Sequence, residues 1–198
     1  NHMIYLIIYR IIHSNLIFGK LTFIYCESIF LIYIYFTSLF IYDGTDVTMI
    51  RDVHPLNLFN VAGRLYMQKI EGDFMTLEIT DEGGVKMEPV TALPALQGQI
   101  VAALPCGDDV LLLTYSGDGY ILADGTARRW NTDAGDFLKT TQVNRAVETK
   151  DGHYIIGTIS GGVCSIDPEG HLDWSLDVSD GLQNNTVLGL LCDEDDNI

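Results

Sequence analysis

Three histidines, His54, His153 and His171, are the side chains of this sequence best suited to metal binding or to proton transfer near neutral pH. They lie in three separate turns or strand starts, each marked by neighbouring Asp, Gly or Pro residues. A zinc site or an acid–base pair needs its groups on adjoining elements, and the spacing of these histidines indicates no such pairing. The sequence therefore predicts surface histidines and no metal site.

Signatures of known catalytic sites do not occur in the sequence. It contains no Gly-x-Ser-x-Gly elbow, no His-Glu-x-x-His zinc helix and no Walker loop for phosphates. The run Gly157–Gly162, GTISGG, holds a serine among glycines, but its spacing differs from the elbow and fits a strand followed by a hairpin turn. We therefore predict no catalytic residue and no cofactor in this chain.

The acidic run Asp193–Asn197, DEDDN, resembles the start of a calcium-binding loop because oxygen-bearing side chains recur at alternate positions. Such a loop also needs a glycine and a bidentate glutamate further along, and the sequence ends at Ile198 before either could occur. A hairpin turn needs only residues that tolerate tight backbone conformations, as Asp and Asn do. We therefore expect a turn here.

Charge is distributed unevenly along the chain. Residues 1–42 carry only Arg10, Lys20 and Glu27, whereas residues 43–198 carry 9 Lys and Arg against 26 Asp and Glu, a net charge of −17. An acidic body of this kind repels phosphate backbones, and no cluster of basic and aromatic residues offsets it. The sequence therefore excludes nucleic acid as a direct partner, and the acidic residues form a solvated surface.

Residues 1–27 form an apolar N-terminal segment whose structural role the sequence does not decide. The apolar character continues to Tyr42, and Glu27 is the one charged residue between Leu21 and Tyr42. A membrane helix needs about 20 apolar residues and would have to bury Glu27. The local Ile, Tyr, Phe and Thr content favours strands instead. Three interpretations stay open: a signal or membrane anchor, strands of a degenerate repeat, and a segment that is not native coding sequence.

A repeat of about 44 residues runs through the rest of the chain. Gln99–Trp130 and Val143–Trp174 each read as strand, polar turn, strand ending in Thr, Gly-rich turn, third strand, Asp-containing turn, and fourth strand with a tryptophan. The spacing from Thr114 to Thr158 and from Trp130 to Trp174 is 44 residues in both cases. Four short strands in about 44 residues are typical of one β-propeller blade.

Weaker copies flank these two units. We expect β-propeller blades over residues 28–198, with approximate limits of 28–55, 56–98, 99–142 and 143–184, and the start of another blade at 185–198. Propellers close with about four to eight blades. The predicted fold is therefore all-β, a partial β-propeller of about three to four blades of four-stranded antiparallel sheet, and we expect the chain to be a fragment.

The last stretch, Gly181–Ile198, carries a family resemblance. GLQNNTVLGLLCDEDDNI is similar to the two-component-regulator propeller repeat, in which a Gly-Leu-x-x-Asn/Asp-x-Val loop leads through an apolar strand to an Asp-x-x-Gly-Asn turn. Asp196 stands where that repeat has its glycine. The resemblance identifies this stretch as the opening of a blade.

A second resemblance covers residues 133–172, which look like a blade from sensors that follow the propeller with a triple-tyrosine β-domain. The matching features are Asp136-Phe137-Leu138, Asp151-Gly152, Gly157-Thr158 and Gly161-Gly162-Val163. The resemblance implies a non-catalytic sensor domain on the periplasmic or extracellular side of a membrane-anchored bacterial receptor. Its implied partners are neighbouring blades, a triple-tyrosine domain, and an output such as a histidine kinase outside this chain.

Ligands of propellers bind at the mouth of the central channel, near the innermost strands. We expect those strands to begin at Gln99, Val143 and Asn185, which makes Asn144, Arg145 and Glu148 candidate ligand-binding residues. The predicted ligand is a small molecule or an oligosaccharide. A surface cluster joined by hydrogen bonds or an ion pair would explain the same three residues without a ligand.

Two other functions stay open at this stage. One is a fragment of a carbohydrate-active enzyme, a propeller lyase or glycosidase, whose cluster of acids and bases would have to come from other blades. The other is an intracellular propeller that binds proteins. Because a partial propeller exposes sheet edges, we also expect the isolated chain to self-associate.

Overall fold

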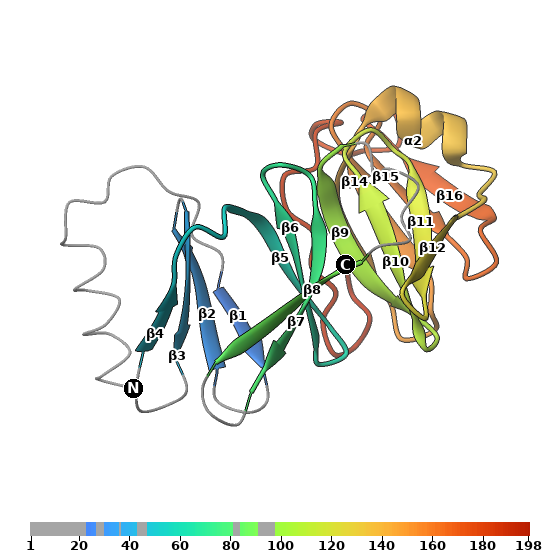
Figure 1. The fold of residues 1–198 in the computed structure, drawn as a ribbon. Coiled ribbons are helices and arrows are strands. Elements are labelled where there is room, and N and C mark those ends of the chain that lie inside the picture. Colours follow the sequence, from blue (N-terminus) through green and yellow to red (C-terminus); the bar gives the residue numbers. More distant parts are fainter. Residues whose placement is uncertain (1–22, 27–29, 36, 43–46, 81–83, 91–97) are drawn as a thin grey trace. The chain divides into compact units, whose positions relative to one another are not determined.

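The computed structural model describes residues 23–26, 30–35, 37–42, 47–80, 84–90 and 98–198, and Figure 1 shows its strands. The chain divides into two compact units, Asn1–Pro55 and Leu56–Ile198. The described strands form four sheets of four antiparallel strands each, and within every sheet the strands are adjacent in chain order. Each sheet is therefore a meander in which three short turns join four strands.

The first sheet lies in the first unit. The other three sheets lie in the second unit, except that the first strand of the second sheet begins at Pro55, the last residue of the first unit. The strands of the first and second sheets are β1 (Phe23–Cys26), β2 (Phe30–Tyr35), β3 (Ser38–Tyr42) and β4 (Val47–Ile50), then β5 (Pro55–Val61), β6 (Arg64–Lys69), β7 (Phe74–Ile79) and β8 (Val85–Pro89). Those of the third and fourth sheets are β9 (Ile100–Cys106), β10 (Asp109–Thr114), β11 (Gly119–Ala123) and β12 (Thr126–Arg129), then β13 (Val143–Glu148), β14 (Tyr154–Thr158), β15 (Val163–Ile166) and β16 (Leu172–Leu176).

The predicted fold class is confirmed: the chain is a partial β-propeller built from four-stranded antiparallel sheets. The turns form where the sequence supplies residues that accept a positive φ, such as Gly117 at +86° and Gly162 at +78°. Asp124, the first residue of an Asp-Gly turn, also adopts a positive φ, of 47°. These short turns join neighbouring antiparallel strands, and the strand pairing of the third and fourth sheets is interrupted only by local bulges, such as the one between Val143 and Arg145.

The third and fourth sheets share one hydrophobic core. Leu111, Leu113 and Ile121 of the third sheet pack with Tyr154 and other apolar residues of the fourth, and the side chains of this group are 0–2% exposed. Trp130 meets Tyr154 edge to face, with ring centroids 5.7 Å apart and an interplanar angle of 83°. A second core, which includes Tyr66, Phe74, Leu112 and Tyr120, joins the second and third sheets.

The helix α2 (Gly135–Thr141) was not predicted by the sequence, which shows no helical periodicity of useful length. Seven residues are too few for a clear period, and tertiary contacts rather than propensity stabilise so short a helix. Leu138 is only 1% exposed, and the helix backbone at Leu138 lies so close to Gly117 that a Cβ there would be 2.4 Å away. The glycine that makes the hairpin turn therefore also makes room for the helix.

Two further details differ from the expected strands. Trp130 was expected in the fourth strand of its blade, but β12 ends at Arg129, and Trp130 follows it with its N–H donating to the carbonyl of Gly119 at 2.9 Å. The segment 185–198 was expected to open with a strand, and no strand is formed there, although the Val187 N–H donates to the Thr158 carbonyl at 2.9 Å. The expected turn is present within Asp193–Asn197, where the Asp193 N–H donates to the Asn197 carbonyl at 3.0 Å.

Strands β1 and β2 lie in the apolar N-terminal run, and β1 precedes residue 28, where we expected the first blade to start. Residues 1–22 and 43–46 lie outside the described residues. Among the residues that the structure describes, no helix has the length and apolar character needed to cross a lipid bilayer.

Replacing Gly119 by alanine should destabilise the second unit. A Cβ at this position would lie 2.6 Å from the Trp130 ring, so the ring would have to move out of its contact with Tyr154. Overpacking of this kind costs about 1–3 kcal/mol in unfolding free energy, which urea denaturation followed by tryptophan fluorescence would measure. The matched control is Gly135→Ala, because a Cβ there meets nothing within 4 Å and alanine favours a helix. An equal loss in both variants would contradict this account of the Trp130 packing.

Candidate functional site

The three residues predicted to bind a ligand all lie on β13, an edge strand of the fourth sheet that contacts β9 of the third sheet. Strand pairing passes from Val143 opposite Thr158 directly to Arg145 opposite Gly157, so Asn144 is the extra residue of a β-bulge. A bulge redirects one side chain relative to a regular strand. Asn144 is therefore set apart from Arg145 and Glu148 by backbone geometry.

Asn144 holds the C-terminal segment against the fourth sheet. Its Nδ2 donates a hydrogen bond of 2.7 Å to the carbonyl of Val187, and the Val187 N–H donates to the Thr158 carbonyl at 2.9 Å. Both the N–H and the carbonyl of Val187 are thus hydrogen-bonded to the fourth sheet. The amide of Asn144 has a structural use that sequence reasoning did not anticipate.

Arg145 and Glu148 differ in exposure. Arg145 is exposed, and its Nη1 donates to the carbonyl of Asn144 at 2.8 Å. Glu148 is partly buried and lies opposite Tyr154 in the sheet, and burial raises the pKa of its carboxyl above the ordinary value of 4.5. Their role in binding a ligand stays a prediction.

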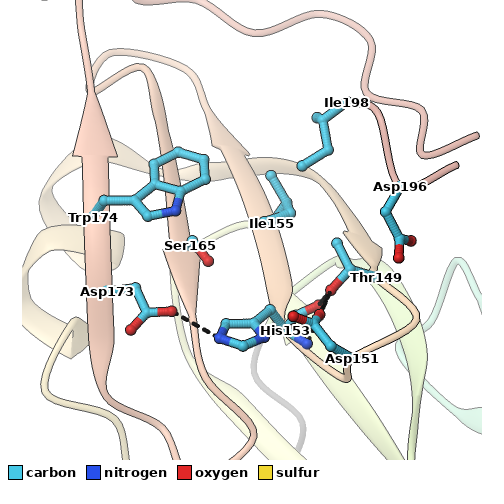
Figure 2. Close-up of a pocket in the computed structure, with 9 residues that line it drawn as sticks. All are labelled: Thr149, Asp151, His153, Ile155, Ser165, Asp173, Trp174, Asp196 and Ile198. Carbon is cyan, nitrogen blue, oxygen red and sulfur yellow. Dashed lines mark hydrogen bonds and ion pairs between the residues drawn. The ribbon is translucent and has the colours of Figure 1, made fainter.

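A hollow of about 250 Å³ lies beside the outer part of the fourth sheet and the end of the chain. Figure 2 shows its lining, in which His153 and Trp174 lie on the side of the sheet and Ile198 lies across from them. The complete lining consists of Thr149, Asp151, His153, Ile155, Ser165, Asp173, Trp174, Asp196 and Ile198. This hollow does not include the predicted residues of β13.

His153 is the polar centre of the hollow, and its side chain is 28% exposed. Its Nε2 lies 2.8 Å from Oδ2 of Asp173 on β16, and its Nδ1 lies 3.1 Å from Oδ1 of Asp151 without the alignment of a hydrogen bond. The imidazole therefore connects the turn between β13 and β14 to the outermost strand of the same sheet. His153 was predicted only as a surface histidine in a turn, and its contact with Asp173 on β16 was not anticipated from the sequence.

The other acidic groups of the hollow also have partners within the protein. Asp151 accepts a 2.5 Å hydrogen bond from the Thr149 hydroxyl, which holds the pKa of this carboxyl below its ordinary value. Asp196 accepts a hydrogen bond of 3.0 Å from the N–H of Lys150, whose ammonium group donates to the carbonyl of Glu194. These bonds fix the loops around the hollow in place.

The Asp193–Asn197 turn uses its carboxylate oxygens internally. Oδ1 of Asp193 accepts hydrogen bonds from the N–H groups of Asp195 and Asn197 at 2.8 Å and 2.9 Å, and the Asn197 amide donates to both carboxylate oxygens. These bonds lower the pKa of Asp193. Within the described residues, no three His, Cys, Asp or Glu side chains are arranged to hold a metal ion.

Comparison with known proteins supports the fold. No family model matches the chain, and neither does any curated protein. The extracellular domain of the one-component system BT4673 from B. thetaiotaomicron is similar to it, with a TM-score of 0.57 and 17% identity over 86% of this chain and 24% of that one. YCF48 from Cyanidioschyzon merolae is similar with a TM-score of 0.53 and 13% identity, over 75% of this chain and 53% of that one.

At these identities the likeness establishes a β-propeller fold and no specific activity. The chain spans about a quarter of the length of the BT4673 domain and about half the length of YCF48. The class of the protein is therefore a partial β-propeller, and a wider role is a matter of proposal.

Replacing Asn144 by alanine should loosen the C-terminal segment. The carbonyl of Val187 would lose its 2.7 Å hydrogen bond, at a cost of about 1 kcal/mol. Hydrogen exchange measured by mass spectrometry should show faster exchange in the peptide that contains Val187. Arg145→Ala is the control, since Arg145 is exposed and its removal should change stability by less than about 0.5 kcal/mol. Unchanged exchange in Asn144→Ala would mean that other contacts alone seat this segment.

Replacing Glu148 by glutamine should stabilise the fold at neutral pH. The folded state binds the Glu148 proton more tightly than the unfolded state, because burial raises this pKa, so the ionised carboxylate opposes folding. That penalty is complete above the folded-state pKa and disappears below the ordinary value of 4.5. Urea unfolding at several pH values should therefore show a gain for Glu148→Gln at neutral pH that vanishes in acid. A gain that is independent of pH would contradict the assignment.

Proposed function

We propose that this chain is a non-catalytic sensory segment of a bacterial signalling receptor, on the periplasmic or extracellular side of the membrane. The observation that carries the proposal is the blade sequence Gly181–Ile198, which resembles the repeat of regulator propellers and packs on the fourth sheet through Val187. The likeness to an extracellular domain of a one-component system, over 86% of this chain, supports the same role.

A propeller suits this role because its repeats are coupled through continuous packing. A ligand shifts a receptor between two states only by the difference in its affinity for them. A small molecule or oligosaccharide near Arg145 and Glu148 would act on β13, which belongs to the fourth sheet and contacts β9 of the third. In this proposal the neighbouring blades and a triple-tyrosine domain carry the change to the output, which is a histidine kinase or another regulator.

The sequence of the gene on both sides of this chain tests the proposal directly. We expect further propeller repeats, a triple-tyrosine β-domain, a membrane-spanning helix and a signalling output in the same reading frame. A lyase or glycosidase domain in place of the output, or a reading frame with no membrane segment and no regulator, would overturn it.

A further inference from the structure

Two tryptophans at equivalent positions of the repeat lie in different environments. Trp130 and Trp174 are 44 residues apart, yet Trp130 is 9% exposed and Trp174 is 39% exposed. Trp130 is covered because Tyr154, from the following sheet, packs edge to face on its ring. The greater exposure of Trp174 therefore corresponds to a following sheet that the described structure lacks.

The exposed tryptophan belongs to a wider apolar face of the fourth sheet. In the strand pairing Trp174 lies opposite Ser165 and Leu176 lies opposite Val163, which puts these residues on one face. The alternate residues Cys164 and Ile166 belong to the core shared with the third sheet, so the Trp174 face points away from it. Leu176 is 40% exposed, although its cross-strand partner Val163 is buried.

The segment Val187–Ile198 already repeats contacts that join the second and third sheets. Asn57 Nδ2 donates to the carbonyl of Ile100 at 2.8 Å, as Asn144 does to that of Val187. Each of these pairs is separated by 43 residues in sequence.

The first turns of successive blades show the same relation. The Arg64 guanidinium donates to the carbonyl of Asp108, and the Lys150 ammonium donates to the carbonyl of Glu194, with 44 residues between the partners in each case. The C-terminal segment therefore contacts the fourth sheet in the same way that β9 and the turn after it contact the second sheet.

The end of this segment reaches the hollow beside Trp174. Ile198 is 44 residues after Tyr154, and it lines the hollow together with Trp174, as Tyr154 covers Trp130. Leu188 and Leu191 are 74% and 77% exposed. The segment therefore has the position of an inner strand, but these two side chains are not covered by partner strands in the described structure. The hollow of about 250 Å³ lies between Ile198 and Trp174, the two residues that correspond by the 44-residue repeat to Tyr154 and Trp130.

We propose that the hollow and the Trp174 face seat a further four-stranded sheet, whose inner strand is Val187–Leu191 and whose other three strands come from polypeptide that follows Ile198. The same chain is the source because its inner strand is already seated, so the remaining strands need only the closure of short loops. A separate protein would have to offset the entropy of association as well. The proposal rests on packing and does not depend on a sensory role.

The test compares this chain with a version that is extended by about 40 codons of its gene, roughly one blade. In the extended protein, hydrogen exchange of the peptide that covers Val187–Leu191 should slow at least tenfold. With Trp130→Phe in both proteins, Trp174 is the single tryptophan, and the extension should shift its emission to shorter wavelength and reduce its quenching by iodide at least twofold. The exchange measurement uses the native sequence, so it stands even if Trp130→Phe folds poorly.

The Gly157→Ala variant perturbs the contact between Val187 and the fourth sheet. A Cβ at Gly157 would lie 2.5 Å from Cγ1 of Val187, so this variant should abolish the protection that the extension gives. Gly135→Ala, where a Cβ meets nothing within 4 Å, should retain it.

Three results would overturn the proposal. One is an extension that leaves exchange and quenching unchanged, and another is a set of codons after Ile198 that encodes no further strands. The third is a shielded Trp174 in the present chain together with a dimer in sedimentation, which would assign the Trp174 face to a second copy of the chain.

Discussion

The need to cover both faces of a four-stranded sheet is the constraint on which the rest of this structure depends. In β14 and β15, the central strands of the fourth sheet, every residue is buried, although alternate side chains point to opposite faces. One face packs on the third sheet through Tyr154 and Ile156, and the other receives Val187 over Gly157. A single sheet of this size cannot supply both covers, so stability comes from the stacking of neighbours.

Polar side chains set the register of this stacking, which apolar packing alone would leave free to slide. Gln68 is 1% exposed, accepts a hydrogen bond from the N–H of Ile100 at 2.8 Å and donates to the carbonyl of Gly98 at 2.9 Å. Asn57 adds a donor to the carbonyl of Ile100. Because an unpaired buried amide is costly, a shifted register would leave these groups unsatisfied. The start of β9 is therefore fixed by two side chains of the preceding sheet.

Much of the fold could be predicted from the sequence because the turns carry local signals. Glycine and aspartate mark the hairpins of the third and fourth sheets, and the 44-residue spacing of Thr114 and Thr158 shows that both occupy the same place in a blade. The helix α2 escaped prediction because its single buried leucine, Leu138, gives no period. Local signals thus identify turns and strands, and they miss an element that only tertiary contact stabilises.

The site was harder to predict because its contacts join residues distant in sequence. The residue types at His153 and Asp173 are visible, but their 2.8 Å contact depends on the pairing of β13 to β16 across a whole sheet. Asn144 was predicted as a ligand-binding candidate on an inner strand, and the bulge that directs its amide to Val187 is visible only in the strand pairing. Such contacts follow from topology and not from spacing.

The same polar contacts bear on how a propeller could transmit a signal. Asn144 lies beside Arg145, whose exposed guanidinium is available to solvent, while the Asn144 amide holds the next segment through Val187. A ligand that moved the backbone of β13 would therefore act on the seat of the following segment without crossing the hydrophobic core. Because each repeat contacts only its neighbours, such a change would pass from blade to blade as a sequence of interface adjustments. Coupling of this kind requires that the ligand bind two arrangements of the interface with different affinity.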